Sequence, residues 1–174
     1  KQIKLYVMRK ITFLFVLASM LLLNACKKSE SVSADKLKPG KSKISLSASG
    51  ATSGSFSSDD LMSTVGKSSA LINISASSVN LKTFTTEIVV LILSADITPG
   101  TYALKPMSSS NATPTFAYTK GSTGWAAAPA ENDFTLVVTK ATATEIEGTF
   151  SGKANNDSEH TEVTITNGKF AAKY

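Results

Sequence analysis

The stretch that decides the fold runs from residue 145 to residue 150 and reads EIEGTF. Small or apolar residues alternate in it with polar ones: Ile146, Gly148 and Phe150 lie between Glu145, Glu147 and Thr149. Successive side chains of a β-strand point to opposite faces, so this period of two predicts a strand with one buried and one solvent-exposed face.

The same period returns further along the chain, in the stretch TEVTITNGKFAAKY that runs from residue 161 to residue 174. Val163 and Ile165 repeat the alternation, and Asn167-Gly168 predicts a tight hairpin or a bulge. The stretch from Phe170 onward is expected to close the sheet, again with every second residue apolar.

Outward from this region, the chain is rich in Thr, Ser, Val and Ile and is punctuated by turn residues such as Thr98-Pro99-Gly100. Residues 88–93 are continuously apolar, which predicts a strand that is covered on both sides. Residues 58–65 offer the one candidate for a helix. Further strands are expected around Ile44, Leu46 and Ala48, over residues 70–76, over 101–104, over 115–119 and 125–127 as a hairpin, and around Phe134, Leu136 and Val138.

About eight to ten short strands with short loops predict an all-β protein, either an antiparallel β-sandwich or a flattened barrel. Three stretches also resemble a family of small Bacteroidota lipoproteins of uncharacterised function. They are Pro99-Gly100-Thr101-Tyr102, Ile146-Glu147-Gly148-Thr149-Phe150, and the segment VTITNGKF of residues 163–170. The resemblance implies a β domain of the cell envelope and carries no catalytic residues over to this chain.

The N-terminal segment has the features of an export signal. Basic residues at positions 9 and 10 follow Met8, the expected start, and residues 11–23 are apolar except for two hydroxyl side chains. This run is too short to span a bilayer, and it ends in Leu23-Asn24-Ala25-Cys26, which resembles the lipobox of bacterial lipoproteins. We therefore expect residues 1–25 to comprise a segment upstream of the start and, from Met8, a signal peptide that is removed, and we expect Cys26 to carry lipid.

Residues 26–43 follow as a polar segment that reads CKKSESVSADKLKPGKSK, and we expect it to be a disordered tether ahead of a β domain over residues 44–174. A cysteine that carries two or more acyl chains is firmly held by a membrane. Lys27, rather than an aspartate, follows Cys26, which favours the outer membrane in enteric-type sorting.

The composition limits the classes of partner that the protein is expected to bind. Four of the 18 basic residues precede Cys26, so 14 basic and 13 acidic residues remain after it, with no arginine among them. Nucleic-acid binding needs a clustered basic face, so this class is disfavoured. Once Cys26 is acylated, no thiol remains for a disulfide. No cofactor motif is present, and the expected partners are the membrane, through the lipid, and a glycan or an envelope protein.

Two groups of residues are candidate ligand sites. Exposed aromatic rings can stack on sugars, and four aromatic residues gather around or beside the expected central hairpin: Tyr102, Phe116, Tyr118 and Trp125. Capping of the core by Trp125 is the alternative. Oxygen ligands suit Ca²⁺, and one loop is rich in them, namely Asn155, Asn156, Asp157 and Glu159, although without the spacing of an EF-hand.

Three functions are compatible with these features. The first is a non-catalytic, membrane-anchored binding module of the cell envelope. The second is a structural or accessory subunit of an envelope or surface assembly, joined through a sheet edge. The third is a glycan hydrolase on a β scaffold, which would need two carboxylates across a cleft, from Glu145 and Glu147 or from the cluster around Asp157. His160 is expected to be an exposed loop residue.

Overall fold

The computed structural model describes residues 32–58, 62–103, 114–127 and 134–174. The chain divides into two units, Lys1–Ser31 and Val32–Tyr174, and only the second is described. The predicted signal peptide, the lipobox residues Leu23, Asn24 and Ala25, and Cys26 lie outside the described residues. No helix in the described part of the chain is long and apolar enough to cross a membrane.

The second unit is built from strands and one short 3-10 helix. The helix is η1 (Ala34–Lys36). The strands are β1 (Lys41–Gly50), β2 (Gly54–Ser57), β3 (Ser63–Lys67), β4 (Leu71–Asn80), β5 (Thr85–Ser94), β6 (Gly100–Ala103), β7 (Thr115–Lys120), β8 (Thr123–Ala127), β9 (Phe134–Ala141), β10 (Glu145–Asn156) and β11 (Thr161–Lys173).

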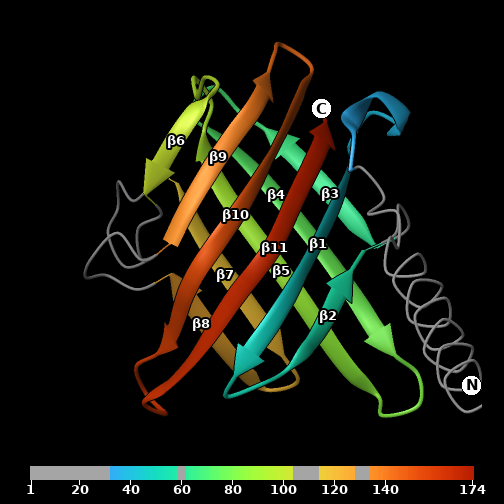
Figure 1. The fold of residues 1–174 in the computed structure, drawn as a ribbon. Helices are drawn as coiled ribbons and strands as arrows, with labels where there is room; N and C mark the ends of the chain where they lie inside the picture. Colours follow the sequence, from blue (N-terminus) through green and yellow to red (C-terminus); the bar gives the residue numbers. More distant parts are fainter. Residues whose placement is uncertain (1–31, 59–61, 104–113, 128–133) are drawn as a thin grey trace, which may run out of the picture. The chain divides into compact units, whose positions relative to one another are not determined.

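These strands form one antiparallel sheet that curls into a half-barrel (Figure 1). The order is β2-β1-β11-β10-β8-β7-β5-β4-β3, with β9 pairing β10 above β8 and β6 pairing β9. The curl brings β3 back toward the start of β1. There the Val65 N–H donates to the Gly40 carbonyl at 3.3 Å, and the Ser42 hydroxyl lies 3.1 Å from the Thr64 carbonyl. The predicted all-β antiparallel fold is confirmed, and of the two architectures it is the barrel-like one.

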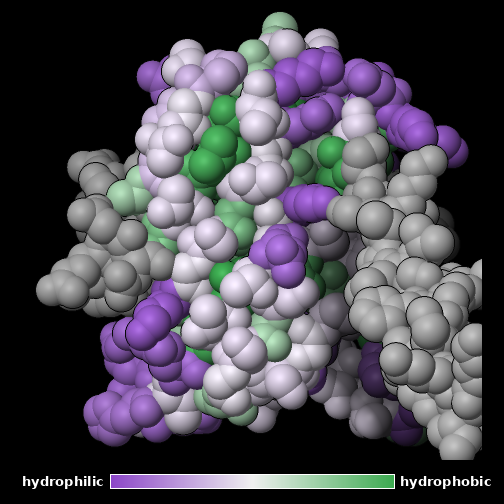
Figure 2. Space-filling view, in the orientation of Figure 1, coloured by the Kyte–Doolittle hydropathy of each residue, from purple (hydrophilic) through white to green (hydrophobic). Residues whose placement is uncertain are grey.

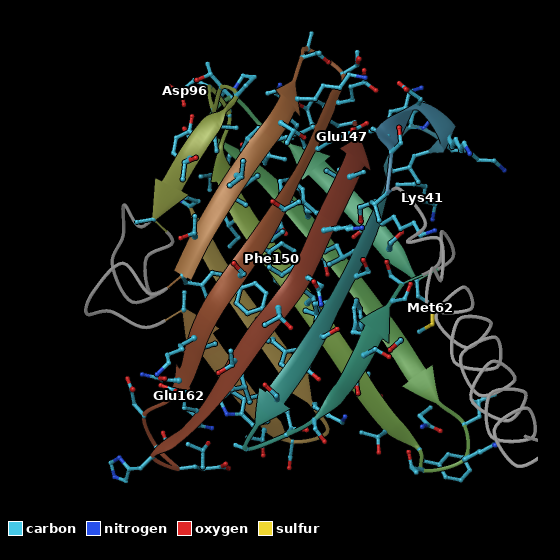
Figure 3. The ribbon with its side chains drawn as sticks, viewed as in Figure 1. Lys41, Met62, Asp96, Glu147, Phe150 and Glu162 are labelled. Carbon is cyan, nitrogen blue, oxygen red and sulfur yellow. The ribbon has the colours of Figure 1, made fainter. Side chains whose placement is uncertain are left out.

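The inside of the curl is filled by one hydrophobic core. Alternate residues of almost every strand contribute to it, and Figure 3 shows the ring of Phe150 on this inner side. The rings of Phe116 and Phe134 are 4.6 Å apart, and Phe116 and Phe150 are 5.4 Å apart. Aromatic rings bury large areas and favour such tilted pairs, so this cluster stabilises the centre of the half-barrel.

The pairing of β10 with β11 sets a glycine against a phenylalanine twice. Gly148 lies opposite Phe170, and Gly168 lies opposite Phe150. A Cβ atom added at Gly148 would lie 2.2 Å from the Val137 carbonyl oxygen and 2.6 Å from the Phe170 ring. Both glycines therefore make room for the ring across the strand pair.

Asn167-Gly168 is a bulge and not a hairpin, because β11 continues through it. Two residues of β11 lie opposite one residue of β10, between the pairs Phe150–Gly168 and Gly152–Ile165. Asn167 has φ of 53°. Asparagine tolerates this left-handed conformation better than most residues, and the extra residue lets β11 bend with the curl.

Two predictions about elements are corrected, the start of the folded unit and a helix. The folded unit begins before residue 44, since η1 and the first residues of β1 occupy the later part of the predicted tether. Buried Ala34 and Leu37 pack on Ala171, which the low apolar content of residues 27–43 did not reveal. Within residues 58–65, the expected helix is wrong where the structure describes it, because β3 begins at Ser63.

The outer side of β5 is less covered than its apolar sequence indicated. Val89, Leu91 and Leu93 are fully buried in the core, whereas Ile88 on the other face is exposed. A continuous apolar run therefore marks here a strand with a packed inner face and a partly open outer face.

Candidate functional site

The aromatic residues of the central hairpin lie in the core. Phe116, Tyr118 and Trp125 are buried, and the rings of Tyr118 and Trp125 stack at 5.8 Å with 23° between their planes. The Trp125 indole N–H donates to the Thr161 hydroxyl at 3.1 Å. The prediction of an exposed sugar-stacking platform is wrong for these three rings, because they pack in the core. For Trp125 this is the alternative interpretation, in which the ring caps the core.

Tyr102 lies apart from this cluster, on β6, which pairs with β9. Its hydroxyl donates to the Thr98 carbonyl at 2.8 Å, and its ring packs partly buried against the core. Burial, and then the neighbouring Glu87 carboxylate, raise the pKa of Tyr118 to about 12, so this phenol stays neutral at physiological pH. The four aromatic residues therefore do not form a common ligand surface.

The loop considered for Ca²⁺ is the turn between β10 and β11. The Asn156 side-chain oxygen accepts a hydrogen bond from the Glu159 N–H at 2.9 Å, and Glu159 is 3.5 Å from the Thr123 hydroxyl. Asn155 belongs to β10, and its buried side-chain oxygen has no hydrogen-bond partner among the described residues. Asp157 and His160 are exposed in the turn, as expected for His160. The Asn156 oxygen thus closes the turn.

Glu145 and Glu147 lie at the other end of β10, next to η1. Together with Asp35 they are the one described group of three metal-ligand side chains whose oxygens approach within 4.8 Å of one another. The Lys140 ammonium lies among them, 3.1 Å from Asp35 and 2.8 Å from Glu145. These hydrogen bonds raise the pKa of Lys140 and lower the pKa of Asp35.

Glu147 holds the short helix. Its carboxylate accepts a hydrogen bond from the Ala34 N–H at 2.7 Å and one from the Ser33 hydroxyl at 3.2 Å. Figure 3 shows Glu147 beside η1 at the upper end of the half-barrel. The first carboxylate pair of the hydrolase hypothesis, Glu145 and Glu147, thus has structural partners, one a lysine and the other a backbone amide. Asp157 and Glu159 of the second group are exposed in their turn. We call this arrangement of Asp35, Lys140, Glu145 and Glu147 the latch.

The most unusual exposed side chains lie on the hairpin between β4 and β5. Leu81 is 77% exposed and Phe84 is 84% exposed at its tip. Val79 and Ile88 continue this apolar surface along the outer face, since both point away from the core. We call the residues 79–88 the apolar hairpin. Figure 1 places it at the end of the half-barrel opposite η1.

Two hairpins at this end have turns of the same kind. Asn80 starts the first, and its side-chain oxygen accepts from the N–H groups of Lys82 and Thr83 at 3.0 and 3.3 Å. Asn156 starts the second, as described above. Four residues after each asparagine the backbone is left-handed, with φ of 52° at both Phe84 and His160. The common pattern Asn-x-x-x-(Phe/His)-Thr is visible in the sequence and could have identified both turns.

Hydrophilic residues gather at two opposite ends of the visible face (Figure 2). One group covers η1, and the other covers the turn between β10 and β11, while the outer face between them is mostly of intermediate hydropathy. The two ends therefore differ from the outer face and can serve different contacts.

Comparison of the chain with protein-family models, with curated proteins and with solved structures found no match.

Proposed function

We propose that this protein is a lipid-anchored lipoprotein of the cell envelope that binds a protein partner through the apolar hairpin and performs no catalysis. The lipobox-like stretch that ends in Cys26 supports the anchor, and its sorting residue favours the outer membrane. The exposure of Leu81 and Phe84 at one end of the half-barrel supports a domain that presents this end to a partner.

The observation that carries the binding role is the exposure of Phe84. A phenylalanine whose ring is almost entirely in water forgoes about 1.5–3 kcal/mol of burial. Its left-handed φ of 52° adds a backbone cost of about 1–2 kcal/mol for a residue with a Cβ. Glycine would avoid the backbone cost and asparagine would lower it, and neither would place an apolar ring in water. A contact outside the chain explains a ring at this position best.

The place of the hairpin indicates which kind of partner it meets. The described domain begins at Val32, next to η1, and the hairpin lies at the opposite end (Figure 1). An anchor at Cys26 would attach the domain through its η1 end and leave the hairpin at the opposite end free for a partner. An apolar tip in this position fits an apolar cleft on another protein.

The alternatives receive less support from the geometry. A glycan site would need open aromatic rings, and the three rings of the central hairpin are buried. A hydrolase would need two carboxylates free to act, and those of Glu145 and Glu147 belong to the latch. For a subunit joined through a sheet edge, the edge strands β2, β3 and β6 offer only four or five residues each.

A photo-crosslinking experiment in intact cells tests the binding role. A benzophenone amino acid in place of Leu81 is expected to form one discrete protein adduct, which mass spectrometry identifies. Phe84→Gly should weaken that adduct at least about fivefold, equivalent to about 1 kcal/mol of lost contact. The variant should fold as well as wild type, because glycine suits the left-handed backbone at this position.

His160→Gly is the matched control. It also introduces a glycine at the same φ, in the turn between β10 and β11, and it should leave the adduct intact. The binding proposal would be wrong if the benzophenone at Ser158 gave the same adduct, or if Phe84→Gly and His160→Gly affected the adduct at position 81 equally.

A further inference from the structure

Lysines gather at the end of the half-barrel where the described chain begins. They come from different elements but share this end, and we call them the lysine rim: Lys36, Lys38, Lys41, Lys67 and Lys173. Lys36, Lys38 and Lys67 are exposed. Lys67 lies over the ring of Tyr174 at 4.3 Å from the ring centre, which places the end of β3 beside the end of β11.

Four of the described acidic residues share this end: Asp35, Glu145 and Glu147 have partners in the latch or η1, and the exposed Asp96 accepts a hydrogen bond from the Ser94 hydroxyl. Asp35 and Glu145 bind Lys140, which is not part of the rim, and Glu147 accepts hydrogen bonds from η1. At the opposite end, by contrast, three acidic residues lie in or next to the turn between β10 and β11: Asp157, Glu159 and Glu162. The half-barrel is therefore charged differently at its two ends.

One pair in the rim is unfavourable within the protein itself. Lys41 and Lys173 are directly opposite each other where β1 pairs with β11. Like charges at directly opposite positions of a sheet repel each other. Glu145 lies opposite Lys173 on the other side, where β10 pairs with β11, and offsets part of this repulsion. An anion beside Lys41 would remove the rest.

The position of Cys26 limits how far the rim can be from a membrane. Five residues separate Cys26 from Val32, and two of them, Lys27 and Lys28, are also basic. Six consecutive Cα steps span at most about 21 Å whatever their conformation. A lipid on Cys26 would thus keep the rim within reach of the headgroups.

We infer that the lysine rim binds the anionic headgroups of the membrane that holds the lipid anchor. This inference rests on the proposed function and adds an orientation to it: the half-barrel stands with η1 toward the bilayer and the apolar hairpin away from it. Each lysine close to an anionic surface raises membrane association about fivefold, and the attraction falls off within about 10 Å at 0.1 M salt.

Fluorescence energy transfer to a labelled headgroup tests the orientation in the intact, acylated protein. Because Cys26 is the only cysteine, Ser69→Cys beside Lys67 and Ser122→Cys in the turn between β7 and β8 each provide a unique thiol for the donor. In vesicles of phosphatidylcholine with about 30% phosphatidylglycerol, transfer from position 69 should be at least about twofold that from position 122. Pure phosphatidylcholine, or about 0.5 M salt, should bring the two values together.

Charge-neutral variants identify the groups responsible. The triple variant Lys36→Gln, Lys38→Gln and Lys41→Gln should abolish the difference between the two probe positions. The double variant Lys82→Gln and Lys153→Gln, away from the rim, should preserve it. Equal transfer from both probes in anionic vesicles, or a difference that survives the triple variant, would overturn the inference.

The same samples separate this inference from the proposed anchor. Mass spectrometry of the Cys26 peptide, together with flotation on pure phosphatidylcholine vesicles, reports the anchor without any contribution from the rim. A chain without acyl groups would refute the anchor. Flotation of that chain on anionic vesicles, with and without the triple variant, would then still decide whether the rim binds lipid.

Discussion

Gly148 and Gly168 show how a residue without a side chain can support a core. Each gives its space to a phenylalanine on the neighbouring strand, and the two rings meet at 6.4 Å between their centres. A glycine in a strand weakens it when nothing replaces the missing side chain. Here the ring across the strand pair covers the backbone, so the cost of the glycine is offset by the burial of Phe150 and Phe170.

Gly148→Ala should therefore lower the free energy of unfolding by about 1–3 kcal/mol or more, because the added methyl group meets the Val137 carbonyl and the Phe170 ring. Denaturant unfolding measures the effect. Gly66→Ala is the control, since a Cβ at that position has no atom within 4 Å. We expect it to leave stability unchanged or to raise it by up to about 1 kcal/mol. Equal results for both variants would contradict this explanation of Gly148.

The sequence could predict only part of this arrangement. The alternation around residue 148 identifies the strand and its inner face, but the register that sets Gly148 against Phe170 depends on pairing between segments that are distant in the chain. Gly168 next to Asn167 could have indicated a turn or a bulge, and the curl of the whole sheet selects the bulge.

Among the elements, η1 depends most on contacts outside itself. A helix of three residues cannot be stable by its own hydrogen bonds, so its place is set by the latch and by the packing of Ala34 and Leu37 on Ala171. The sequence shows these residues only as part of a polar stretch. The interaction of η1 with β10, more than a hundred residues away, leaves no local signal in the sequence.

Lys140→Met should release η1. Without the ammonium group, the carboxylates of Asp35, Glu145 and Glu147 repel one another at close distance. We expect the Ala34 amide to exchange with solvent severalfold faster, while the amides of the core strands keep their protection. Lys153→Met is the control, because it removes an exposed ion pair with Glu162 far from η1. Unchanged exchange at Ala34 would show that the latch does not hold the helix.

The pH dependence of the latch follows from Asp35. Its folded-state pKa lies below the ordinary value of 3.8, chiefly because Lys140 donates a hydrogen bond to its carboxylate. The stability that the Asp35–Lys140 interaction contributes is therefore present above pH 3.8 and is lost as the pH falls through the lowered pKa of Asp35. The carboxyl-carbon signal of the Asp35 side chain in NMR spectra should keep its position at pH 5 and move only in more acidic solution. In Lys140→Met the shift should begin at higher pH.

Strands were easier to predict than their connections. Period-two alternation identified β1, β4, β9, β10 and β11 because each has one face in the core. The short strands β2 and β3 lack that signal, since β2 buries one residue and β3 buries a serine. The apolar hairpin was missed because exposure of Leu81 and Phe84 depends on where the turn points, and apolar residues in a sequence are ordinarily assigned to the core.

At the scale of the whole molecule, the half-barrel has two different ends. Lysines and the latch lie at the end where the described chain begins, and the apolar hairpin lies at the other (Figure 1). The core between them is continuous and closely packed, so it holds the two ends at a fixed separation. This arrangement suits a spacer that is fixed at one end to a membrane and offers the other end to a partner.

The central claim is the lipid anchor, and the mass of the N-terminal peptide of the protein purified from cell membranes tests it most directly. The account predicts that this peptide begins at Cys26 and carries a diacylglyceryl group, or that group with a further acyl chain. A Cys26→Ala chain should lack the modification and keep the residues that precede it. Recovery of wild-type protein with a free Cys26 thiol and residues 8–25 still attached would contradict the account.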